Sequence, residues 1–377
     1  MTAGAGTAAR LDTDSDAPSS IESFCWLLGP HVPGMPPSAS TAQVEAIAAE
    51  LLHAWQVAPV VVPAFLRWIR PEHRDGPRVA LLRARARAAQ VFAELQRERI
   101  LELVRAFEAA GISYALLKSA ALRFQIYAQP EQRCGEDIDL LVARRDLGSA
   151  RRVVEGLGYE PAQWNEARRR YERADPQLRQ LVEAQHHELG FSIRRERVHS
   201  LPEQTRDAVF AQLALRPWLW HLTPAGELAT DMMVDVHHGL ALDISGDALL
   251  ATRRRAVLGG ALAWVPSPAW SMFYSIYKLY WEGVHHYREG VHHYADLTRL
   301  APTLDAGDVD ELWQLLAAYN LLAAAHFVLR RLAPEFGVTL GPAIHALIDA
   351  AGAPDTRTGA LDQNDYGDVW PKLWGQR

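Results

Sequence analysis

The stretch CGEDIDLLVARRD, residues Cys134–Asp146, places three acids within four positions and then runs into Leu-Leu-Val. Side chains two apart on a strand share a face, so Asp137 and Asp139 are expected to project together. Two adjacent carboxylates repel each other unless a cation lies between them, and a hard divalent ion such as Mg²⁺ prefers oxygen ligands. An exposed strand edge would also accommodate the pair.

A third acid strengthens the metal interpretation. Asp235 lies in MVDVHHGL, residues 233–240, between two valines of a second expected strand. Three carboxylates suit a two-metal site with the ions roughly 3.5–4 Å apart. One ion would hold nucleotide phosphates and the other would acidify an acceptor hydroxyl, with Asp235 nearest that hydroxyl as ligand or base. Lys118 and Ser119 stand at an expected strand-to-helix turn, where helix amides favour an anion.

The surrounding pattern predicts a compact α/β unit, because short apolar runs alternate with helical periodicity. The expected strands are ISYALLK (112–118), DIDLLVA (137–143), HHELGFSIRRE (186–196) and DMMVDVHHGLAL (231–242). The expected helices are SAALRFQIYAQ (119–129), DLGSARRVVEGLGY (146–159) and the stretch 166–184.

Helices are expected on both sides of this unit. Two helices are predicted over Thr41–Ile69 and one long helix over Asp75–Gly111, with Gly76-Pro77 at its start and a glycine at its end. After Pro266 only helices are expected, in the segments 267–287, 294–301, 308–333 and 341–352. The predicted divisions are a disordered leader (1–20), an N-terminal helical region (21–110), a core (111–247), a C-terminal helical domain (248–352) and a tail (353–377).

Composition narrows the class of protein. The chain has 377 residues, 49% of them apolar and 22% charged, with two cysteines and a net charge of −6. That charge disfavours a protein that coats nucleic acid or binds a membrane surface, because binding to many phosphates requires a positively charged surface. Two cysteines provide no disulfide framework, and no apolar run approaches the roughly 20 residues that span a bilayer. A soluble, cytoplasmic protein is expected.

The segment GISYALLKSAALRFQIYAQPEQRCGEDIDLLV resembles the uncharacterised nucleotidyltransferase family of the DNA polymerase β-like superfamily. The matching positions are Gly111-Ile112, Leu117-Lys118, Ala120-Ala121-Leu122, Tyr127, Arg133, Asp137 to Val142, Gly158-Tyr159 and Asp235-Val236-His237. The resemblance implies an α+β fold with a mixed sheet, a nucleoside triphosphate as donor, Mg²⁺, and Asp137, Asp139 and Asp235 as its ligands. Ser119 stands where the family has glycine, and Lys118 occupies the glycine position of the wider superfamily's Gly-Ser turn.

Five further residues are candidates for nucleotide binding. Lys118 and Ser119 would hold phosphate at their turn, and His237 shares a strand face with Asp235. Arg133 would contact phosphate or pair with Glu136. The candidates for nucleotide binding are therefore Lys118, Ser119, Arg133, His237 and Lys278. Lys278 and its neighbour Tyr277 would reach the triphosphate from the helical domain, with core packing as the alternative for Tyr277. Asp296 is expected to pair with a cation or to cap a local structure.

Histidine doublets at 186–187, 237–238, 285–286 and 292–293 raise the question of zinc. A zinc site is disfavoured, because adjacent histidines on a strand point to opposite faces and no H-E-x-x-H pattern is present.

The expected function is that of a metal-dependent nucleotidyltransferase of the EC 2.7.7 type. It would move NMP from an NTP, such as ATP, to a hydroxyl or phosphate on a small molecule, peptide or protein, with two Mg²⁺ ions. Nucleic-acid and membrane partners are not expected. The alternative is a catalytically inactive nucleotidyltransferase-like module that serves binding or assembly.

Overall fold

The structure is a computed structural model, and it describes residues 27, 40–52, 55–198, 201, 203–210, 219–241, 244–286 and 291–351. The expected leader (1–20) and tail (353–377) lie outside the described residues. Within the described part of the chain, no helix has the length and apolar character needed to cross a membrane.

A mixed sheet forms the centre of the molecule, with strand order β1-β2-β7-β5-β3-β4 and β6 paired to β7. The strands are β1 (Tyr114–Leu116), β2 (Asp137–Val142), β3 (Glu160–Asn165), β4 (Arg170–Arg173), β5 (Ser192–Arg197), β6 (Trp220–Leu222) and β7 (Leu228–His237). β2 and β7 run parallel, whereas the other pairs in this sheet are antiparallel. Every residue of β7 is buried, as expected for a strand covered on both faces. The α+β class expected from the sequence is confirmed.

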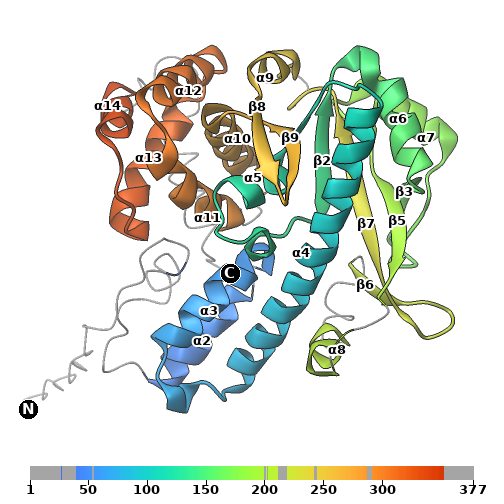
Figure 1. Cartoon of the computed structure of the whole chain (residues 1–377). Helices are drawn as coiled ribbons and strands as arrows, with labels where there is room; N and C mark the ends of the chain where they lie inside the picture. Colours follow the sequence, from blue (N-terminus) through green and yellow to red (C-terminus); the bar gives the residue numbers. More distant parts are fainter. Residues whose placement is uncertain are drawn as a thin grey trace, which may run out of the picture.

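The long helix α4 (Pro77–Ala109) lies across this sheet (Figure 1). Alanine and arginine favour helix, and Pro77 at the first turn needs no amide partner. Gly111 just after the helix has φ +65°, the left-handed conformation that glycine adopts without strain. Phe92 and Phe107 of α4 pack into the sheet core, so α4 supports the strand that carries the acidic pair.

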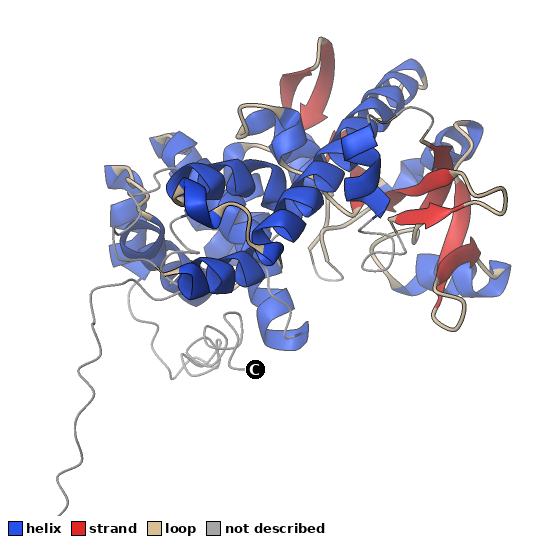
Figure 2. Cartoon of the chain, turned by 90° about the horizontal axis from the view of Figure 1, so that it is seen from below, coloured by secondary structure: helices blue, strands red, loops and turns tan. Residues whose placement is uncertain are grey.

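A second core lies among the helices. It joins α2 (Thr41–Leu51) and α3 (Ala58–Trp68) to helices from the other end of the chain. Those are α10 (Pro268–His286), α11 (Val291–Leu300), α12 (Ala306–Ala318), α13 (Leu322–Phe336) and α14 (Pro342–Ala351). Figure 2 shows these helices gathered at one end of the molecule and the main sheet at the other.

The remaining helices are short. They are α5 (Lys118–Gln125), α6 (Leu147–Gly156), α7 (Pro176–Gln185), α8 (Glu203–Phe210) and α9 (Asp247–Thr252), with single 3-10 turns at Trp55–Val57, Pro71–His73, Pro130–Gln132, Arg144–Asp146 and Ala301–Thr303. In Figure 1, α5 lies between the helices and the sheet.

The helix predicted over 166–184 is wrong in its first half, because that part forms the β3–β4 hairpin. Arg169 adopts φ +49° in the turn, and the Asn165 side chain accepts a hydrogen bond from the Arg168 amide at 3.0 Å. Trp164 and Tyr171 pack edge to face across the strands with ring centroids 5.1 Å apart. These cross-strand contacts outweigh the helix propensity of the Glu-Ala-Arg run.

Two other local predictions were incomplete. The single helix expected over 308–333 is divided into α12 and α13 at Asn320, which has φ +56° and is a residue type that tolerates this conformation. A hairpin of β8 (Arg254–Leu258) and β9 (Ala261–Val265) was not predicted within 248–352. Its turn is Gly259-Gly260, both with positive φ, as a two-residue type I′ hairpin turn requires.

Candidate active site

The three predicted acids meet at one cavity of about 600 Å³. In the parallel pairing of β2 with β7, Asp139 lies directly opposite Asp235. Their exposures are 0% and 2%. Asp137 begins β2, two residues before Asp139, and also lines the cavity. The strand register therefore brings together carboxylates that are nearly one hundred positions apart in the sequence.

Among the described residues, each buried carboxylate of this pair has one oxygen close to a donor nitrogen and one oxygen without a hydrogen-bond partner. Asp139 Oδ1 accepts a hydrogen bond from Lys118 Nζ at 2.5 Å and lies 2.8 Å from His237 Nε2. Asp235 Oδ2 lies 3.3 Å from the same His237 nitrogen. Among the described residues, Asp139 Oδ2 and Asp235 Oδ1 have no hydrogen-bond partner. Buried carboxylate oxygens without donors are costly, so this pair suits a hard cation with oxygen ligands.

The pKa values of the three acids are shifted in different directions. Burial and the charge of Asp139 raise the pKa of Asp137 to about 7. Burial alone would raise the pKa of Asp139, but the charges and hydrogen bonds of Lys118 and His237 together outweigh burial and lower that pKa below its usual range. Burial and the charges of Glu188 and Asp139 raise the pKa of Asp235 well above its usual value. The site therefore carries more negative charge than Lys118 compensates.

Lys118 and Ser119 lie at the turn from β1 into α5, where the sequence predicted an anion site. Lys118 adopts φ +45°, which explains why the wider superfamily pattern has glycine at this position. The Ser119 side chain is buried and its hydroxyl has no hydrogen-bond partner among the described residues. A Cβ at Gly135 would lie 2.0 Å from that hydroxyl, so only glycine permits this approach.

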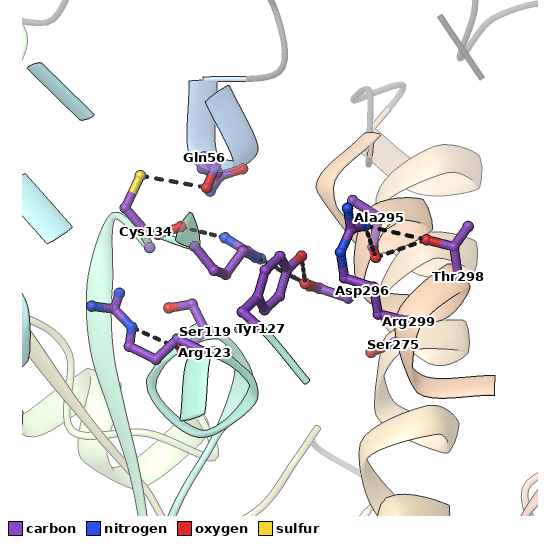
Figure 3. A network of polar contacts seen from close by, with 12 residues as sticks. Gln56, Ser119, Arg123, Tyr127, Cys134, Ser275, Ala295, Asp296, Thr298 and Arg299 are labelled. Carbon is purple, nitrogen blue, oxygen red and sulfur yellow. Dashed lines mark hydrogen bonds and ion pairs between the residues drawn. The ribbon is translucent and has the colours of Figure 1, made fainter. Parts of the chain in front are cut away.

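Two residues that the sequence did not single out hold the start of β2. Gln96 of α4 donates to the carbonyls of Gly135 at 3.2 Å and Asp137 at 3.1 Å, and it accepts from the Gly135 amide at 3.2 Å. Arg123 of α5 donates to Gln96 and, at 3.1 Å, to the carbonyl of Ser119 (Figure 3). Both are buried, and they position the aspartate strand against the Lys118 turn.

Arg133 has a buried carboxylate partner at the opposite wall of the cavity. Its guanidinium contacts Asp296 of α11 at 3.0 Å and donates to the Cys134 carbonyl. The Tyr127 hydroxyl donates to the same Asp296 at 2.7 Å (Figure 3). Arg133 therefore pairs with Asp296, and Asp296 has the cationic partner expected for it. The predicted phosphate contact of Arg133 would have to compete with this pair.

Helix α10 supplies the wall that faces the acids. Lys278 and Tyr274 line the same cavity as Lys118, so the expected approach of Lys278 from across the cleft agrees with its position. Tyr277 instead stacks between Tyr274 and Trp281, with ring centroids 6.1 and 6.2 Å away, and packs against the helical core. The core-packing alternative holds for Tyr277. His237 is 1% exposed and faces the acid pair, as its position on the strand predicted.

Comparison with known proteins gives one family. A family model described as an uncharacterised nucleotidyltransferase matches residues 49–337, which is more than half of the chain. No curated protein matches the chain. The crystal structure of an antigenic nucleotidyltransferase-like protein from Paracoccidioides brasiliensis is similar at a TM-score of 0.33 and 13% identity, covering 59% of this chain and 86% of that chain.

Proposed function

The chain belongs to the uncharacterised nucleotidyltransferases, and from this premise we propose that it transfers NMP from an NTP to a hydroxyl or phosphate acceptor. The acceptor would be a small molecule, a peptide or a protein. The observation that carries the proposal is the register of β2 and β7, which sets Asp139 opposite Asp235. Within the described part of the chain, one oxygen on each has no hydrogen-bond partner. The family membership supports the transferase class, and the acid pair supports catalysis by this chain.

Asp137, Asp139 and Asp235 are the residues that would hold Mg²⁺. When bound, the ions would neutralise phosphate charge and favour the deprotonated acceptor oxygen. Lys118 of α5 and Lys278 of α10 both line the cavity and would bind the triphosphate oxygens. The cavity volume, about 600 Å³, is within the range of pockets that enclose a ligand of nucleotide size.

The chemistry of the proposed step balances without another reactant. The acceptor oxygen forms a bond to the α-phosphorus, the bond from that phosphorus to the oxygen bridging to the β-phosphate breaks, and pyrophosphate leaves. Asp235, which lies opposite Asp139 at the cavity, is the carboxylate that would take up the acceptor proton. Asp139 has the lowered pKa of the pair and stays ionised.

One observation favours the second candidate function, an inactive module that binds nucleotide without transfer. The Lys118 ammonium lies 2.5 Å from Asp139 Oδ1 and already neutralises one carboxylate of the set. A cation fixed there would weaken metal binding if it does not move to the triphosphate when nucleotide enters.

Calorimetry with each NTP, in Mg²⁺ or in EDTA, followed by transfer of label from the α-phosphate to acceptors in cell extract, tests both functions. Wild-type protein is expected to bind at least one NTP in Mg²⁺ and to label an acceptor, whereas Asp137→Asn and Asp139→Asn should bind weakly and label nothing. Absence of NTP binding by the wild-type protein would disprove the nucleotidyltransferase proposal. Tight binding without labelling would support the inactive module.

A further inference from the structure

A second group of potential metal ligands lies on the far side of His237 from Asp139. The His187 and His237 rings are 5.7 Å apart between centroids, with 26° between their planes. Glu188 Oε2 lies 3.7 Å from His237 Nδ1 and 3.8 Å from His187 Nε2. One ligand atom from each of the three residues falls within 4.8 Å of the others.

The contacts of His237 determine which of its nitrogens can bind a cation. Its Nε2 lies 2.8 Å from Asp139 Oδ1, an acceptor, so Nε2 carries the hydrogen. In the neutral ring the lone pair is then on Nδ1, which is buried and has no hydrogen-bond partner among the described residues. The Glu188 oxygen at 3.7 Å is too far for a hydrogen bond. Asp139 therefore accepts a hydrogen bond from the ring nitrogen of His237 that would not bind the ion, and such a carboxylate orients metal-binding histidines.

The positions of the two rings suit a shared ion. Two imidazole nitrogens about 2.1 Å from one tetrahedral metal place the ring centroids roughly 5 Å apart. The observed separation of 5.7 Å needs only a small adjustment. The side chains of His187 and Glu188 are 24% and 29% exposed, which leaves a path for an ion from solvent.

The backbone holds this arrangement in place. A bridge joins Glu188 to His237, and the His238 amide donates to the His187 carbonyl at 2.8 Å. One ring from each of two doublets, His187 and His237, therefore lies in the same cluster. The sequence considered the two histidines of a doublet as ligands of one ion, and the structure instead pairs rings from different doublets.

We propose that His187, Glu188 and His237 form a binding site for a divalent transition-metal ion of the Zn²⁺ type. Two imidazole nitrogens and one carboxylate are the ligands that zinc accepts with a fourth position left open. The site uses none of the aspartate oxygens that suit Mg²⁺, although Glu188 lines the same cavity as the aspartates, and it does not depend on nucleotidyl transfer. A bound ion would hold His237 in the tautomer that donates to Asp139.

The test uses full-length protein stripped with a chelator, without nucleotide. Zn²⁺ is titrated against a competing chromophoric chelator, and Co²⁺ is added separately for its visible absorption spectrum. Wild-type protein is expected to bind one equivalent of Zn²⁺ and to give a Co²⁺ spectrum of low coordination number. His187→Gln and Glu188→Gln should weaken Zn²⁺ binding on the order of 100-fold and abolish that spectrum. Both side chains are partly exposed, so these variants are expected to fold.

His238→Gln is the matched control, because its ring lies in the same doublet as His237 and makes a hydrogen bond to the His186 carbonyl at 3.1 Å. Asp137→Asn is the second control and reports on the aspartate site. Both should retain wild-type Zn²⁺ affinity. Wild-type affinity in His187→Gln, or a loss confined to Asp137→Asn, would overturn the proposal. Because no nucleotide is present, failed nucleotidyl transfer leaves a positive zinc result intact, and absent zinc binding leaves the Mg²⁺ proposal intact.

Discussion

Two walls of the same cavity carry buried acids that differ in whether all of their oxygens are hydrogen-bonded. Asp296 of α11 is 0% exposed, and both of its oxygens are hydrogen-bonded, to the Tyr127 hydroxyl at 2.7 Å and to Arg133 at 3.0 Å. Asp139 and Asp235 on the sheet are equally buried, yet each has one oxygen without a partner among the described residues. Both oxygens of the acid on the helical wall are paired, whereas the described residues leave one oxygen of each acid on the sheet wall without a donor.

This difference shows that burial alone does not identify a functional acid. A carboxylate whose oxygens are all paired stabilises the fold, and its removal leaves its partner charge uncompensated. A buried carboxylate with an unpaired oxygen lowers stability in the empty protein, and this cost is recovered only when a ligand binds. The two walls should therefore respond to the same Asp→Asn substitution in opposite ways.

The largest effect is expected for Asp235→Asn. Loss of base assistance should slow single-turnover transfer about 10²–10⁴-fold, while the melting temperature stays level or rises because one unpaired charge is removed. Asp231→Asn is the matched control, since Asp231 lies on the same strand outside the cavity and pairs with Arg195 at 2.9 Å. Normal transfer by a destabilised Asp235→Asn protein would assign Asp235 to structure.

Asp296→Asn should show the reverse behaviour. Breaking the buried pair with Arg133 is expected to cost about 3–5 kcal/mol of unfolding free energy, measured by chemical denaturation. The double variant Arg133→Met/Asp296→Leu, which removes both charges, should recover part of that loss. If Asp296→Asn unfolds like the wild-type protein, the proposed contrast between the two walls is wrong.

The pH dependence of stability gives a third comparison. Asp137 has a folded-state pKa of about 7, raised by burial and by Asp139, so the metal-free folded protein holds a proton that the unfolded chain releases near its ordinary pKa. Stability from this group is therefore lost as pH rises toward 7. Denaturation in EDTA between those pH values should show Asp137→Asn gaining stability relative to wild type as pH increases. Parallel curves for the two proteins would contradict this.

The smallest expected effect distinguishes the contribution of the Lys118 charge to nucleotide binding from the contribution of its backbone conformation to stability. Lys118→Ala and Lys118→Gly should both weaken the nucleotide Kd more than they slow transfer, because both remove the same cation. Since residue 118 has φ +45°, the glycine variant should be about 1 kcal/mol more stable than the alanine variant. Calorimetry supplies the Kd and denaturation the stability. Equal stabilities would mean that the turn relaxes without strain.

Several elements were predictable because their determinants are local. The spacing of apolar residues, Pro77 and Gly111 predicted α4, and alternation predicted the strand that begins at Asp137. The acids themselves were found from a two-residue spacing and from a family resemblance. The β3–β4 hairpin was missed over 166–173, because its stability comes from ring and ion-pair contacts across two strands.

The sequence by itself determined which residues can carry charge and which segments are helical or extended. It determined the shared face of Asp137 and Asp139, because strand geometry repeats every two residues. Only the tertiary structure decided which charges meet. The parallel register placed Asp235 opposite Asp139, and the packing of α11 gave Arg133 its partner Asp296. These pairings join positions far apart in the chain, so they depend on how the sheet and helices pack rather than on any local pattern.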